Sequence, residues 1–230
     1  MTFLTPPPSP TFGKYTAPPT PRPRPPKRQK IGESNEARSS SSYGFSFCQI
    51  HNGSSQPLPS NSTGKIFCID FDKTITNQNI HDLCGLISYE DRVDLFTSIK
   101  EQVNPIGEEG QWCRILTNLV NSGHFIAIVS FNEYPKVMLK FLEESVALEP
   151  KILEQICIIT RFSTDKNMHI ERAVGEYMRR GGRAYPTCSD IVLIDDNSKN
   201  IEAAKRKGYK TLLAAGEFLV GIENFFSKSI

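Results

Sequence analysis

The sequence predicts an α/β domain with a Rossmann-like parallel sheet and helices on both faces, preceded by a disordered proline-rich tail. From residue 65 onward, short uninterrupted apolar runs alternate with segments of helical periodicity, which is typical of strands buried on both faces. Residues 1–38 hold ten of the 16 prolines and carry a net charge of +5, a composition that buries too little apolar surface to fold. We therefore expect a tail and linker over residues 1–64 and a folded domain over residues 65–230.

The predicted elements follow one another in a regular order along this domain. Pro135 suits the first turn of one helix, and Gly123 and Gly208 suit the ends of two others. The strands are expected at 66–70, 124–130, 155–160, 190–195 and 210–214, and the helices at 79–87, 90–103, 108–123, 135–146, 166–182 and 200–208.

Polar side chains lie where the predicted strands end. Asp70 and Asp72 follow the first strand, and alternation along an extended backbone would point both carboxylates to one side, where they need a cation or a shared proton. In open parallel sheets, ligands bind at the carboxyl ends of the strands. Carboxylates there can hold Mg²⁺, while a hydroxyl, a lysine and a helix N-terminus can neutralise phosphate oxygens. The other polar residues at these ends are Ser130, Lys166, Asp195 and Asp196.

Four segments resemble, in order, the four motifs of the haloacid dehalogenase-like (HAD) superfamily of phosphohydrolases. They are DFDKT, VSFN, DKNMHI and LIDDNSKNIEAAKRKG, and the resemblance covers roughly residues 65–215. It implies a HAD-like fold and Mg²⁺-dependent phosphomonoester hydrolysis through an aspartyl-phosphate.

The resemblance also implies a role for each matching residue. Asp70 is the expected nucleophile, and Asp72 the expected general acid and base, a kind of help worth roughly a hundred- to ten-thousand-fold. Thr74 is expected to brace the loop, while Ser130 and Lys166 are expected to bind the phosphate.

The metal set implied by the resemblance is Asp70, the backbone carbonyl of Asp72 and one residue of the last acidic pair. Asp196 matches the aspartate that follows glycine in other members, so it is the expected ligand, and Asp195 is expected to support it. Asn200 stands where many relatives have a second acidic residue, so we expect modest affinity for Mg²⁺.

The substrate class is predicted from the short spacing between the motifs. Members that act on small molecules usually carry a cap domain, whereas here only a short helical insertion around residues 80–103 could serve. An open site favours a phosphoprotein or another phosphorylated macromolecule. The alternatives are a small-metabolite phosphatase and a HAD-fold scaffold that is recruited through its proline-rich tail.

The rest of the chain limits other functions. None of the six cysteines has an arginine six residues later, which excludes a cysteine-dependent phosphatase, and residues 39–230 carry a net charge of −3, which does not suggest nucleic-acid binding. The four histidines show no metal-ligand spacing and are interpreted as surface or capping groups. No apolar run is long enough to span a membrane.

The tail suggests a binding partner and a location in the cell. Pro23, Pro26 and Arg28 form a PxxPxR pattern that fits an SH3-type groove. We expect a cytoplasmic protein; the alternatives are nuclear import through the basic run PPKRQK and delivery into a host cell.

Overall fold

The computed structural model describes residues 64–87, 94–160, 165–182 and 184–227, all within one unit of the chain, Phe45–Ile230. The expected tail lies outside the described residues except for Gly64, and so does the pattern of Pro23, Pro26 and Arg28. Within the described part, no helix has the length and apolar character needed to cross a membrane.

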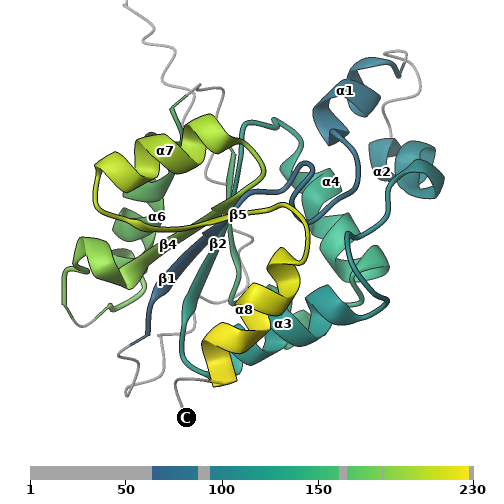
Figure 1. Ribbon diagram of the computed structural model, residues 1–230. Helices are drawn as coiled ribbons and strands as arrows, with labels where there is room; N and C mark the ends of the chain where they lie inside the picture. The colour runs from purple at the N-terminus through teal and green to yellow at the C-terminus, as the bar shows by residue number, and fades with distance from the viewer. Residues whose placement is uncertain (1–63, 88–93, 161–164, 183, 228–230) are drawn as a thin grey trace, which may run out of the picture. The chain divides into compact units, whose positions relative to one another are not determined.

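A five-stranded parallel sheet forms the centre of the domain (Figure 1), in the strand order β3-β2-β1-β4-β5. This is the order of Rossmann-like folds, in which the direction of strand addition reverses beside the first strand. The predicted fold class is therefore confirmed. The strands are β1 (Ile66–Ile69), β2 (Phe125–Ser130), β3 (Cys157–Thr160), β4 (Ile191–Asp195) and β5 (Lys210–Leu213).

Both faces of the sheet are covered, which explains the uninterrupted apolar runs of the sequence. Every residue of β1, β2, β3 and β4 is buried, whereas the edge strand β5 exposes Lys210 and Leu213. Alternate side chains enter two separate hydrophobic cores: Phe67 and Ile69 pack into one, and Ile66 and Cys68 into the other.

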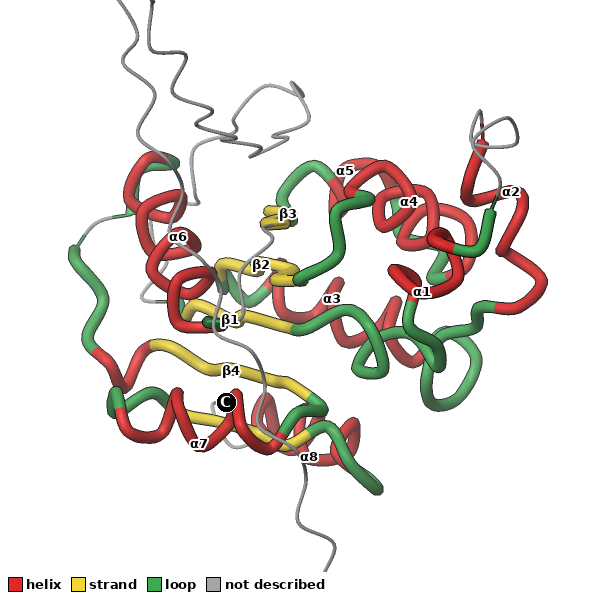
Figure 2. The backbone as a smooth tube through the Cα atoms, turned by 90° about the horizontal axis from the view of Figure 1, so that it is seen from above, coloured by secondary structure: helices red, strands yellow, loops and turns green. Residues whose placement is uncertain are grey.

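The helices divide between these two cores (Figure 2). Helices α6 (Lys166–Arg179) and α7 (Ser198–Arg206) pack on the core of Ile66 and Cys68. The opposite core includes residues of α3 (Gln111–Asn121), α4 (Pro135–Lys140), α5 (Pro150–Leu153) and α8 (Phe218–Ser227), together with a π-helical turn, Phe141–Ser145.

The helix boundaries follow the predicted signals. Pro135 is the first residue of α4, and Gly123 and Gly208 follow the ends of α3 and α7 with φ of 75° and 84°, in the left-handed region that favours glycine. Two helices were not predicted. Helix α5 is only four residues long, too short to show a helical period, and α8 is apolar at most of its positions.

A short insertion between β1 and α3 carries α1 (Ile80–Gly85), α2 (Leu95–Ile99) and a 3-10 turn, Lys100–Gln102; residues 88–93 lie outside the description. Its two ends are joined. The N–H of Asn77 donates to the carbonyl of Asn104 at 2.9 Å, the N–H of Asn104 donates to Asn77 Oδ1 at 2.9 Å, and Thr76 forms an antiparallel bridge with Pro105. The insertion thus leaves and rejoins the domain at one point.

Candidate active site

The polar strand ends meet at the point where the strand order reverses. Asp70 follows β1 and Asp195 ends the neighbouring β4, and the N–H of Asp70 donates to the carbonyl of Ile194 at 2.8 Å. A pocket of about 350 Å³ opens there, at the place where Rossmann-like sheets bind ligands. It is lined by Asp70, Asp72, Lys73, Asn79, His81, Ser130, Phe131, Asn132, Asp196, Asn197 and Asn200.

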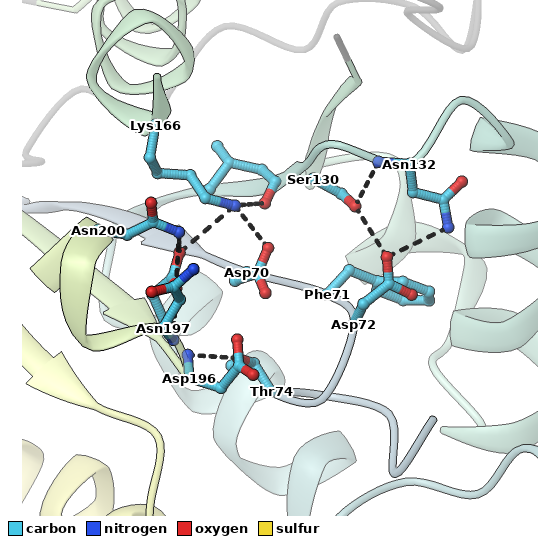
Figure 3. Close-up of polar contacts among 12 residues, drawn as sticks. Asp70, Phe71, Asp72, Thr74, Ser130, Asn132, Lys166, Asp196, Asn197 and Asn200 are labelled. Carbon is cyan, nitrogen blue, oxygen red and sulfur yellow. Dashed lines mark hydrogen bonds and ion pairs between the residues drawn. The ribbon is translucent and has the colours of Figure 1, made fainter. Parts of the chain in front are cut away.

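Lys166 is buried behind Asp70, which lines this pocket, and its side chain joins three strands (Figure 3). Its Nζ donates to Asp70 Oδ1 at 2.6 Å and to the carbonyl of Val129 at 3.0 Å, and it lies 3.4 Å from Asp195 Oδ2. Burial by itself lowers the pKa of Lys166, but Asp70 and Asp195 together raise it above its ordinary value. The side chain is therefore a fixed cation behind the aspartates.

The start of α6 brings Lys166 to this position. Asp165 caps the helix by accepting a hydrogen bond from the N–H of Asn167 at 3.0 Å, so that the helix begins at Lys166. The ammonium group also lies 4.3 Å from the centre of the Phe131 ring, which favours its charged form.

Asp70 is almost completely buried, and its environment favours the protonated carboxyl. Burial raises the pKa of Asp70 to about 7, opposed by Lys166 and reinforced by the neighbouring carboxylate of Asp195. A divalent cation next to Asp70 would favour the ionised form that a nucleophile requires.

Asp72 lines the same pocket but has different partners from Asp70. Its Oδ1 accepts the N–H of Ile80, the first residue of α1, at 2.7 Å. Its Oδ2 lies 3.4 Å from Ser130 Oγ and 3.5 Å from Asn132 Nδ2, both hydrogen-bond donors. Burial raises the pKa of Asp72, and the N–H of Ile80 is the largest opposing influence.

Asp70 and Asp72 line the same pocket, as strand alternation predicted. Strand β1 ends at Ile69, and the chain then turns, with the N–H groups of Ile75 and Thr76 donating to the carbonyl of Phe71. The carboxylates that gather closely are those of Asp70, Asp195 and Asp196.

These three carboxylates fit a divalent cation. They offer oxygen atoms that all lie within 4.8 Å of one another, near the roughly 4 Å that separates opposite oxygen ligands of Mg²⁺. Burial, followed by the charge of Asp195, raises the pKa of Asp196, and a cation would relieve this crowding of like charge.

Asp195 and Asp196 differ in burial and in the number of hydrogen bonds that their carboxylates already accept. Asp195 is fully buried and accepts the N–H of Asn197 at 2.8 Å, and Asn200 Nδ2 at 3.0 and 3.1 Å on its two oxygens. Asp196 is half-buried and lines the pocket, and its N–H donates to Thr74 Oγ1 at 3.1 Å. Asp196 thus borders the pocket, Asp195 is held beside it by Asn197 and Asn200, and Thr74 links the ends of two strands.

Several residues of the pocket were not predicted. Asn132 lies in the segment VSFN, two residues after Ser130, and donates its N–H to Ser130 Oγ at 3.0 Å, so its motif offered a signal. Lys73 lies in the segment DFDKT and so had the same kind of signal, whereas Asn79 had none. His81 lines the pocket although it was interpreted as a surface or capping group. The same interpretation is wrong for His169, which is fully buried against Phe131.

The comparisons with known proteins are sparse. No family model matches the chain, and no curated protein matches it. Among solved structures, the chain is similar to one described as a phospho-aspartyl intermediate analogue of phosphoserine phosphatase, with 15% identity and a TM-score of 0.41 over 70% of this chain and 91% of that chain. Likeness at this level carries no argument about activity.

The class of this protein is indicated by its own fold and carboxylate cluster. The chain has a Rossmann-like α/β fold, and its cluster of Asp70, Asp195 and Asp196 at the carboxyl edge of the sheet fits a HAD-like fold.

Proposed function

We propose that the protein hydrolyses phosphomonoesters through an aspartyl-phosphate on Asp70. One observation carries the proposal: Lys166 Nζ lies 2.6 Å from Asp70 and 3.4 Å from Asp195, and Asp70 shares a pocket with Asp72, Ser130 and Asp196. A nucleophile, an acid and donors for phosphate oxygens thus share one site, as phosphoryl transfer through a covalent intermediate requires.

The proposed reaction has two steps. Asp70 attacks the phosphorus, the bond from phosphorus to the ester oxygen breaks, and Asp72 gives its proton to the departing oxygen. Asp72 then takes a proton from a water molecule as that water attacks the aspartyl-phosphate, which releases inorganic phosphate and restores Asp70. Lys166 and Ser130 hold the phosphate oxygens through both steps.

We also propose that Mg²⁺ is held by Asp70, the backbone carbonyl of Asp72 and Asp196. Asn197 and Asn200 support this set by holding Asp195 in place. When bound, the cation neutralises the acidic cluster and the charge that develops on the phosphoryl group. Asn200 turns its amide nitrogen toward Asp195, which directs its oxygen away from that carboxylate.

For the substrate, we propose a phosphoprotein or another phosphorylated macromolecule. The support is the small size of the insertion, whose described helices α1 and α2 have six and five residues. Enzymes with little of their own structure over the site depend on contacts with remote parts of a large substrate.

The proposal is tested by the turnover of an aryl phosphate by the full chain with Mg²⁺. EDTA should abolish the release of phosphate, and Asp70→Asn should reduce it on the order of 10⁴-fold or more, as removal of a nucleophile does. The fold of Asp70→Asn should survive, because the substitution keeps the shape of the side chain. Full activity of Asp70→Asn would refute the covalent mechanism, and full activity in EDTA would refute the metal assignment.

A further inference from the structure

The inference concerns the alcohol part of the substrate, and it rests on the proposed function. If Asp72 protonates the departing oxygen, the alcohol part leaves from the side of the pocket that Asp72 borders. The Oδ1 of Asp72 is held at 2.7 Å by the N–H of Ile80, the first residue of α1. The first turn of α1 therefore forms the wall next to the departing alcohol.

Two side chains of this turn face the pocket. Ile80 itself is buried in the hydrophobic core, whereas its neighbours Asn79 and His81 both line the pocket. The Oδ1 of Asn79 is already used, because it caps α1 by accepting the N–H of Asp82 at 3.3 Å. His81 keeps its ring nitrogen Nε2 for a ligand, because only its Nδ1 is buried.

The surroundings of His81 support this assignment. Its ring is half-buried and tilted at 36° to the ring of Tyr134, with 6.2 Å between the centres. Neither ring nitrogen bonds to another of the described residues, and Nδ1 is buried. The buried Nδ1 cannot reach a ligand in the pocket, so Nε2 is the ring nitrogen that is left to meet a polar group of the substrate.

We propose that His81 selects the alcohol part of the substrate by hydrogen-bonding a polar group close to the ester oxygen. The preferred class is a phosphoester of a polar aliphatic alcohol, such as phosphoserine or phosphothreonine in a peptide. In these residues the backbone amide nitrogen is three bonds from the ester oxygen. In phosphotyrosine an aromatic ring separates the ester oxygen from every backbone polar group, and a simple alkyl phosphate has no such group.

The test compares matched substrates with the full chain and Mg²⁺. Three substrates are compared. The first is a phosphoserine peptide. The second is ethyl phosphate, which has the same kind of ester carbon but no backbone amides, and the third is a phosphotyrosine peptide. The wild-type protein should prefer the phosphoserine peptide in kcat/KM over both others. His81→Phe keeps a planar ring without nitrogens and should reduce the ratio of phosphoserine peptide to ethyl phosphate roughly 3- to 10-fold, the contribution of one hydrogen bond.

Two further variants separate recognition from folding. His81→Gln, which keeps a donor and an acceptor, should restore part of the ratio, and His81→Ala should lower it if His81→Phe does not fold. His124→Gln is the matched control at the opposite end of the sheet, where His124 Nδ1 accepts the N–H of Lys65 at 3.1 Å, and it should leave the ratio unchanged.

The outcomes distinguish the two proposals. If the wild-type protein turns over none of the esters, the proposed function fails. If it turns them over but His81→Phe leaves the ratio unchanged, or the phosphotyrosine peptide is preferred, the function stands and the assignment of His81 is overturned.

Discussion

The pocket has two sides that are built in different ways. The strand-end side, made of Asp70 and Ser130 and backed by Lys166 and Asp195, is buried and connected by short polar contacts. The insertion side, made of Asn79 and His81 together with Lys73 just before the insertion, is half-buried or exposed and has fewer contacts. The difference teaches that the reactive groups are fixed by the sheet, while the groups that meet the rest of the substrate depend on a separate short segment.

Asp72 belongs to both sides, because Ser130 and the N–H of Ile80 both contact its carboxylate. Asp72→Asn should lower kcat/KM for an alkyl phosphate by about 10²- to 10⁴-fold, the usual contribution of a general acid. An activated aryl phosphate should lose far less, because its leaving oxygen needs little protonation. Equal losses on the two esters would show that Asp72 serves only to hold the two sides together.

Lys166→Met tests how strongly the strand-end side depends on its cation. The substitution leaves Asp70 and Asp195 buried without their counter-charge, so the free energy of unfolding at neutral pH should fall by roughly 3–5 kcal/mol. Urea unfolding measures it. The control is Lys140→Met, which breaks an exposed ion pair of similar length, 2.8 Å, with Asp94 and should scarcely change the midpoint. Similar effects of the two variants would contradict the contrast between buried and exposed pairs.

Added Mg²⁺ should stabilise the strand-end side and with it the whole fold. At a hundred times the dissociation constant, a ligand bound only by the folded state adds about 2.7 kcal/mol, which a thermal melt detects. Asp196→Asn should remove most of this gain, and Asp82→Asn, an exposed acid on α1, should retain it. A gain that survives in Asp196→Asn would place the cation elsewhere.

The smallest expected effect comes from glycine substitutions at two residues with positive φ. Lys73 on the insertion side and Ala147 far from the pocket in sequence have positive φ, 60° and 59°, a conformation that L-residues adopt at a cost. Replacing either with glycine should stabilise the fold by about 1 kcal/mol. Lys73→Gly should also lower kcat/KM because it removes a cation from the pocket, whereas Ala147→Gly should not. Unchanged activity in Lys73→Gly would remove Lys73 from the functional part of the insertion side.

The strand-end side could be predicted from the sequence because its residues follow directly from local patterns. Apolar runs locate the strands, parallel pairing aligns their ends, and Asp70, Ser130 and Asp195 therefore meet at one edge. Lys166 could be predicted for a similar reason, since it stands at the start of a recognisable helix.

The insertion side could not be predicted, because its position depends on contacts between distant residues. Helix α1 is held beside the pocket by the bond from Ile80 to Asp72 and by the burial of Ile80 and Cys84 in the core, and no periodicity in the sequence encodes these contacts. Helix α8 was not predicted; apolar residues occupy most of its positions, and a short apolar run does not by itself distinguish a helix from a buried strand.

The joined ends of the insertion make this segment a replaceable module. The bridge between Thr76 and Pro105 and the paired bonds of Asn77 and Asn104 close its stem, and the attachment of Ile80 to Asp72 lies just inside that stem. Because the entropy cost of a loop grows slowly once its ends are held together, the stretch between Gly85 and Leu95 should accept longer grafted sequences. A library built there would vary the surface presented to substrates while the first turn of α1 and the catalytic edge of the sheet stay unchanged.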